Sequence, residues 1–305
     1  MINLLSMIMT YVCILLAMAF YTLLERKGLS YMQTRKGPNK VGIMGILQPF
    51  ADAMKLFLKE NMSPSGANSY IFFLAPGLAL FIALLLWRTY PSDSATKYLK
   101  YGILFFMCVT ALNVYSTLLA GWSSNSKYAF LGALRAAAQT ISYEVSMILI
   151  LLFPIFMTSS MSFDTFSMTK YWLLFLFSPV FFMWICSIVA ETNRAPFDFA
   201  EGESEIVSGF NIEYGAAGFA MLFMAEYMNI LVMSMITTVT FLGASNILFY
   251  NSSMIFTMKI LLVSFIFIWT RVAYPRFRYD LLMTLTWKSF LPVILASLCL
   301  ILLIL

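Results

Sequence analysis

The sequence predicts an all-α polytopic membrane protein, with about eight transmembrane helices and a short amphipathic helix at the membrane interface. Of its 305 residues, 61% are hydrophobic and 11% are charged, and apolar runs recur along the whole length. A bilayer core of about 30 Å needs roughly 20 apolar residues per helix, and long uninterrupted runs favour helices over barrel strands. Because little sequence is left for a soluble domain, residues 1–305 are expected to form a single transmembrane domain.

Eight apolar runs are candidates for the membrane-crossing helices. They cover residues 4–24, 70–87, 99–119, 135–156, 171–190, 215–242, 254–270 and 284–304. An alternative for the first run is a cleaved signal sequence, since Ala17, Met18 and Ala19 mimic a cleavage site. The charges disfavour this alternative, because no positive residue precedes the run and Glu25, Arg26 and Lys27 follow it.

Lysine and arginine fall unevenly on the two sides of these predicted helices. One side receives 14 of the 19 bases, which are Arg26, Lys27, Arg35, Lys36, Lys40, Lys55, Lys59, Lys127, Arg135, Arg194, Arg271, Arg276, Arg278 and Lys288. The other side receives Arg88, Lys97, Lys100, Lys170 and Lys259. Because short non-translocated loops carry the excess of bases, both termini are predicted to lie on the less basic, translocated side.

The chain offers no residue pattern for a bound metal. It has no histidine, and its cysteines, Cys13, Cys108, Cys186 and Cys299, lie far apart inside apolar runs, where they are expected to fill the core. Zinc, haem and iron–sulfur sites need clustered cysteine or histidine, so none is predicted. A nucleophile activated by histidine is excluded for the same reason.

The segment 25–69 is a basic loop that contains a predicted interfacial helix. It carries seven bases against three acids. Within it, Leu47, Phe50, Met54 and Phe57 recur at helical spacing, with Asp52 on the opposite stripe. Two roles stay open for this amphipathic helix: a plain anchor on the lipid surface, or one wall of an entrance through which an amphiphile leaves the bilayer.

The segment 191–214 is an acidic loop on the same side of the membrane. It carries six acids against Arg194 alone. A solvated acidic turn is one interpretation. Phe197, Phe199 and Phe210 are interleaved with the acids, however, which favours a segment folded back into the protein. Crowded carboxyls in such a site share protons, and a proton store or relay is then expected.

Glu144 and Glu226 lie deep in predicted helices. They fall about nine and about twelve residues into the fourth and sixth runs, or roughly 14 and 18 Å from the basic face at the helical rise. A charge at this depth costs at least about 3 kcal/mol, so such residues usually face a wet interior and carry function. A silent buried carboxyl is the alternative.

Three long stretches resemble one known family. They are "GILQPFADAMKLFLKE" at 45–60, "ETNRAPFDFAEGESEIVSGFNIEY" at 191–214 and "PRFRYD" at 275–280. Residues 24–42 and 120–144 are also similar to it. The family is that of subunit 1 of the proton-pumping NADH:ubiquinone oxidoreductase, respiratory complex I, which is related to a membrane subunit of energy-converting hydrogenases.

The resemblance implies a place in the cell. The chain is expected to be a multi-pass protein of the mitochondrial inner membrane, with its basic loops in the matrix and both termini on the intermembrane-space side. The absence of a presequence, the 22 methionines and the small hydrophobic chain suggest synthesis inside the mitochondrion.

The resemblance also implies roles for individual residues. Residues that match positions near the ubiquinone access chamber are Arg26, Arg35, Asp52, Arg276 and Arg278. For Arg26 and Arg35, simple positive-inside topology is the alternative. Residues that match the carboxylate chain coupling quinone reduction to proton translocation are Glu144, Glu191, Glu201, Glu203, Glu205, Glu213 and Glu226.

The same resemblance implies partners and excludes a bound redox centre. The chain is expected to bind no cofactor itself and to admit ubiquinone as substrate, while FMN and the iron–sulfur clusters reside in partner subunits. Expected partners are the hydrophilic quinone-reducing arm, neighbouring membrane-arm subunits and anionic lipid, but not nucleic acid. Without the resemblance, an ion- or proton-coupled transporter or channel and a non-catalytic membrane anchor both remain as interpretations.

Overall fold

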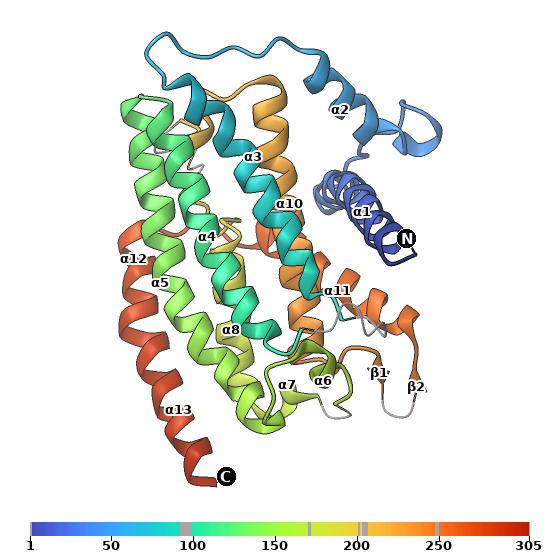
Figure 1. Cartoon of the computed structure of the whole chain (residues 1–305), viewed down its shortest axis with the longest axis vertical. Helices are drawn as coiled ribbons and strands as arrows, with labels where there is room; N and C mark the ends of the chain where they lie inside the picture. The colour runs from blue at the N-terminus through green and yellow to red at the C-terminus, as the bar shows by residue number, and fades with distance from the viewer. Residues whose placement is uncertain are drawn as a thin grey trace.

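Long apolar helices make up most of the chain, so the predicted all-α membrane fold is confirmed (Figure 1). The computed structural model describes residues 2–91, 99–169, 172–200, 202, 207–247 and 250–304. Within these residues, seven helices are long and apolar enough to cross a membrane. The helices are α1 (Ile2–Met32), α2 (Gln48–Leu58), α3 (Ser69–Leu86), α4 (Gly102–Ser123), α5 (Lys127–Thr158), α6 (Phe163–Ser167), α7 (Leu173–Leu176), α8 (Ser178–Glu191), α10 (Ala216–Thr240), α11 (Ser253–Ala273), α12 (Tyr279–Thr284) and α13 (Leu291–Ile304).

Shorter elements connect the long helices. A π-helical stretch, Leu285–Phe290, joins α12 to α13, so that the three form one continuous candidate span. Between α10 and α11, the two-residue strands β1 (Asn246–Ile247) and β2 (Tyr250–Asn251) pair antiparallel. In Figure 1 these strands lie with α6 and α7 at one end of the bundle, and α2 lies at the other end.

The predicted run at 171–190 forms a shorter helix than the others. Phe177 leaves the helical conformation and Pro179 stands in the first turn of α8, so the run divides into α7 and α8. Because α8 has 14 residues, it extends about 21 Å, less than the hydrocarbon thickness of about 30 Å. The chain that follows α8 therefore begins inside the bundle, not at its surface.

Small residues allow the central helices to approach closely. A Cβ atom on Gly121 of α4 would lie 2.3 Å from the Cβ of Ala133 on α5. A Cβ atom on Gly132 of α5 would lie 2.8 Å from the Cα of Gly209. Such close backbone packing is how membrane helices associate without a hydrophobic driving force. It brings Gly209 and Phe210, in the acidic segment (residues 191–214), directly against α5.

The helix α1 lies to one side of the bundle, where it contacts α10, α11 and α2 (Figure 1). In its most hydrophobic stretch, 11% of the residues are buried, whereas the share is 61% in the corresponding stretch of α10. The helix continues to Met32, seven residues past the predicted start of the basic loop at Glu25, so Glu25 and Arg26 are helical residues. The hydroxyl of Tyr21 donates to the backbone oxygen of Ser264 at 3.0 Å and ties α1 to α11.

The predicted interfacial helix corresponds to α2. Its apolar side chains, among them Met54 and Phe57, are exposed in the isolated chain, as expected for a surface that meets lipid or a partner. On its polar stripe, the amide of Gln48 donates to Asp52 at 2.8 Å.

Candidate functional site

The first half of the acidic segment is folded into the bundle. The side-chain amide of Gln139, on α5, donates to the backbone oxygens of Ala190 and Phe197, both at 2.8 Å. Phe197 and Phe199 are buried, and the backbone nitrogen of Phe277 donates to Pro196. The segment is therefore a packed part of the protein over these residues, as the interleaved phenylalanines predict.

The far end of the acidic segment is anchored by an aromatic residue. The ring of Tyr214 stacks on Phe72 of α3, with centroids 4.2 Å apart. Its hydroxyl donates to the backbone oxygen of Ala120 at 3.4 Å and lies 3.3 Å from the hydroxyl of Ser123. Burial raises the pKa of Tyr214, so the phenol stays neutral at physiological pH.

Glu191 and Glu226 line the same small cavity. Glu191 ends α8 and is buried, and Glu226 lies on α10, about 15 Å from the start of that helix. Asn229, one turn further along α10, and Asn113, on α4, also line the cavity. One oxygen each of Glu191 and Asn229 is buried and has no hydrogen-bond partner within the part of the chain that the structure describes. A volume of about 30 Å³ gives room for about two water molecules, which would satisfy these oxygens.

Glu144, on α5, is a third acid near Glu191 and Glu226. It is half-buried, one of its oxygens is buried without a hydrogen-bond partner among the described residues, and it lies close enough to the Glu191 carboxyl to interact with it electrostatically. Tyr143, beside it, is fully buried, with its ring packed 6.2 Å from that of Phe197. Three of the predicted acidic residues, Glu144, Glu191 and Glu226, thus come together from α5, α8 and α10.

Arg194 connects this carboxylate group to α1. Its guanidinium donates to Glu25 at 3.2 Å and lies 4.5 Å from the centre of the Tyr227 ring. Burial lowers the pKa of Arg194, but the neighbouring groups, Glu25 first and also Glu226, outweigh burial and raise it above the ordinary arginine value. Glu25 also accepts a hydrogen bond from Arg271, at the end of α11. The arginine therefore stays cationic between two carboxylates on different helices.

Glu25, Arg194 and Arg271 are absent from the residues that the sequence predicted for the site. Arg194 is the one base among the acids of the segment, and Glu25 is the acid that ends the first apolar run. Both residues stand out in the sequence. Without the fold, however, Arg194 is explained as well by positive-inside topology as by a functional role, and Glu25 as well by an ordinary loop charge.

The residues predicted for a quinone passage form separate ion pairs. Those pairs are Arg26 with Asp52 at 2.5 Å, Arg276 with Asp198 at 3.2 Å and Arg278 with Asp280 at 3.0 Å. The first joins α1 to α2, and the second joins the segment before α12 to the acidic segment. Arg35 is exposed and donates to Gln33 at 2.6 Å.

The remaining predicted acids do not join the cavity in the described residues. Glu201, Glu203 and Glu205 lie outside the part of the chain that the structure describes. Glu213 is half-buried, three residues before α10. Across the described ranges, acids and cysteines form no group of three that would hold a metal ion.

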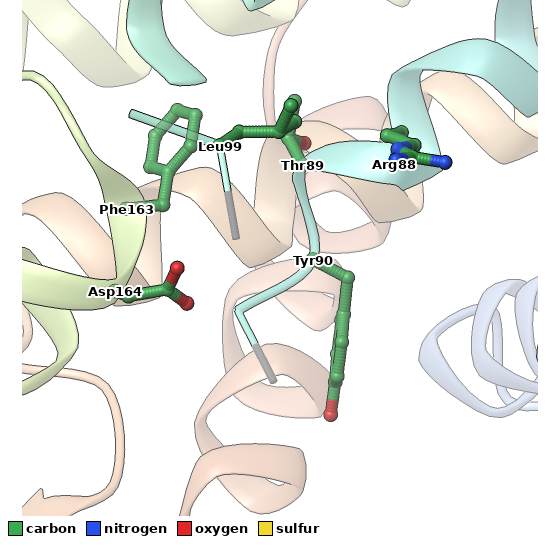
Figure 2. A pocket seen from close by; sticks show the side chains of 6 residues that line it. All are labelled: Arg88, Thr89, Tyr90, Leu99, Phe163 and Asp164. Atoms are coloured by element: carbon green, nitrogen blue, oxygen red, sulfur yellow. The ribbon is translucent and has the colours of Figure 1, made fainter. Parts of the chain in front are cut away.

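A second small cavity lies at the other end of the bundle. It is lined by Arg88, Thr89, Tyr90, Leu99, Phe163 and Asp164. Figure 2 shows that the guanidinium of Arg88 points away from Asp164, so the two do not form a charged pair across the cavity. With about 10 Å³, the cavity has room for one water molecule at most, and no larger ligand fits.

Comparisons with known proteins agree over nearly the whole chain. A family model described as NADH dehydrogenase matches residues 5–302. NADH-ubiquinone oxidoreductase chain 1 of Aedes aegypti is 52% identical over 292 residues, 95% of this chain and 92% of that protein. The protein of the same name from Didelphis virginiana is 53% identical over 302 residues, 97% and 94% of the two chains. That of Heterololigo bleekeri is 52% identical over 300 residues, 97% and 95% of the two chains.

Proposed function

This chain belongs to the NADH dehydrogenase family and is a core membrane subunit of NADH:ubiquinone oxidoreductase, and within that complex we propose two roles for it. It frames the passage by which ubiquinone enters from the bilayer, and its carboxylates couple quinone reduction to proton translocation. The complex lies in the mitochondrial inner membrane. The basic loops face the matrix and both termini face the intermembrane space, in keeping with the positive-inside bias.

The arrangement of α1 and α2 supports the access role. Both helices lie beside the bundle with apolar side chains exposed, and the Arg26–Asp52 pair holds them together. An isoprenoid quinone is an amphiphile, so its tail suits the exposed apolar faces and its polar headgroup suits the charged residues at the end of α1. Partner subunits of the hydrophilic arm complete the chamber and carry FMN and the iron–sulfur clusters, while anionic lipid binds the exposed bases around α2.

One observation carries the coupling role: Glu191 and Glu226, from different helices, line one polar cavity inside a membrane bundle. Neighbouring carboxyls share protons, and Glu144 acts on Glu191 while Glu226 acts on Arg194. A change of charge near Glu25, where α1 meets the bundle, is transmitted through Arg194 to Glu226. Quinone reduction in the chamber thereby alters the proton affinity of the chain of acids.

The test compares two activities of membranes whose complex carries Glu191→Gln. NADH oxidation with an artificial acceptor reports the hydrophilic arm, and NADH:ubiquinone reduction with proton uptake reports coupling. We expect assembled complex on a native gel, a normal artificial-acceptor rate, and at least a tenfold loss of ubiquinone reduction or pumping. Asp164→Asn, which neutralises an acid at the other end of the bundle, is the matched control and leaves both activities near wild type.

The same experiment separates the alternatives. If Glu191→Gln leaves ubiquinone reduction and pumping normal, the carboxylates are structural and the chain serves as an anchor. A transporter would instead move its substrate when reconstituted without the other subunits. Either result would refute the coupling role.

A further inference from the structure

Beyond Asn229, α10 is buried on all sides. Every residue from Ile230 to Thr240 is buried, a length of about 17 Å at the helical rise. A helix that is buried all round leaves no wet face along its length. The polar cavity that contains Glu226 therefore meets a dry stretch on its way to the less basic end of the bundle.

The hydroxyl groups in this stretch are already used by the helix itself. The hydroxyl of Ser234 donates to the backbone oxygen of Leu231 at 2.7 Å, and that of Thr237 donates to the backbone oxygen of Ser234 at 2.6 Å. In the same way, Thr238 donates to Met235 at 2.6 Å, and Thr240 donates to Ile236 at 2.8 Å. A hydroxyl that donates its proton to its own backbone is not free to pass one to a water. These side chains therefore do not form a proton wire.

A buried lysine lies where the stretch ends. Lys259, on α11, is 5% exposed, and its ammonium donates to the backbone oxygens of Leu242 at 2.6 Å and Asn246 at 2.7 Å. It also lies 5.1 Å from the centre of the Trp172 ring. The ion pairs of the described residues do not include it. Its charge is thus stabilised by backbone dipoles and an aromatic ring, and no carboxylate of the described residues forms an ion pair with it.

We propose that Lys259 and the buried stretch from Ile230 to Thr240 form a proton seal at the end of the bundle opposite the acidic segment. The dry stretch denies water a path, and the fixed cation repels a hydronium ion at the exit, as charged residues do in channels that exclude protons. The seal rests on the proposed function, in which protons reach Glu226 from the basic side and must not leak past it to the other side of the membrane.

The charge is tested separately from the hydrogen bonds. In Lys259→Gln the amide retains donors for the two carbonyls but the cation is lost, whereas Lys259→Arg keeps the charge. The complex is reconstituted into proteoliposomes that contain a pH-sensitive dye, and the passive proton leak is measured without NADH after an imposed pH step. We expect the leak per complex to rise about tenfold in Lys259→Gln and to stay within about twofold of wild type in Lys259→Arg.

Two outcomes of the leak assay would overturn the seal. An unchanged leak in Lys259→Gln would show that the lysine only caps backbone oxygens and does not block protons. An equal rise in both variants would show that the leak comes from lost packing and not from the lost charge. Because the assay uses no NADH, neither outcome depends on whether the carboxylates couple quinone reduction to pumping.

Hydrogen exchange of the wild-type complex provides a second test that needs no variant. Peptides from the stretch 230–240 should exchange at least about tenfold more slowly than those from 220–226, which lie past the first turn of α10 and beside the cavity. Equal rates would show that water reaches the stretch, and would overturn the seal.

Discussion

Replacing Glu25 by glutamine should loosen the attachment of α1 to the bundle. The Glu25 side chain is 6% exposed and that of Arg194 is 12% exposed, so the substitution leaves a buried guanidinium without its nearest anion. Breaking a buried pair in this way costs about 3–5 kcal/mol. Because Glu226 still acts on Arg194 and because Arg271 is 44% exposed and can rehydrate, we expect the lower end, about 3 kcal/mol.

Hydrogen exchange of the purified complex measures this loosening. At 1.4 kcal/mol for each factor of ten, about 3 kcal/mol corresponds to roughly 100-fold faster exchange of the amides at the end of α1, residues 25–32. The control is Asp280→Asn, which breaks a pair whose two side chains are 78% and 68% exposed and should cost less than about 1 kcal/mol. Equal exchange at the end of α1 in the two variants would refute the reasoning.

Three further predictions concern packing, the acidic segment and pH. Gly121→Ala should destabilise the complex to heat by about 1–3 kcal/mol, because the added Cβ would overlap Ala133. Gly77→Ala is the control, since its added Cβ meets nothing within 4 Å. Equal melting of the two variants on native gels would contradict this prediction. Gln139→Leu leaves the oxygens of Ala190 and Phe197 unpaired, so proteolysis near residues 192–200 should quicken by about tenfold or more, and an unchanged rate would refute the anchor. Since the pKa of Arg194 is raised, its stabilisation is complete below the ordinary arginine pKa and lost only as pH rises through the raised value. The difference in heat inactivation between wild type and Arg194→Gln should therefore stay constant from about pH 6 to about pH 9, and a steady change across that range would show that Arg194 titrates there.

Seven of the eight predicted membrane helices could be recognised from the sequence because hydrophobic length largely determines which segments cross a bilayer, and the run 171–190 is the exception. Their ends were harder to predict. α1 extends to Met32, past Glu25 and Arg26, because a helix can continue beyond the hydrocarbon while long basic side chains reach the interface. The break at Phe177 follows from Pro179, a residue that hydropathy counts do not register as a boundary.

The candidate site could be predicted in its residue types but not in its connections. Glu191 and Glu226 are unusual acids in an apolar chain, and this is visible in the sequence. Their common cavity depends on the short α8 and on the close approach of Gly132 to Gly209, which are properties of the packed bundle. The link from Glu25 to Arg194 spans 169 residues, and no local pattern reports so distant a pair.

The shortness of α8 also changes how the chain meets an electrical potential. The helix α8 ends after about 21 Å, and Glu191 and the chain that follows lie inside the bundle. Polar groups therefore replace hydrocarbon over part of the membrane thickness. The voltage drop is then concentrated in the remaining dry layer, where the local field is steeper than in the surrounding bilayer. A full elementary charge crossing 100 mV corresponds to about 2.3 kcal/mol. A proton that moves between the cavity and the far side of the dry layer would therefore cross most of the membrane potential and exchange most of that energy.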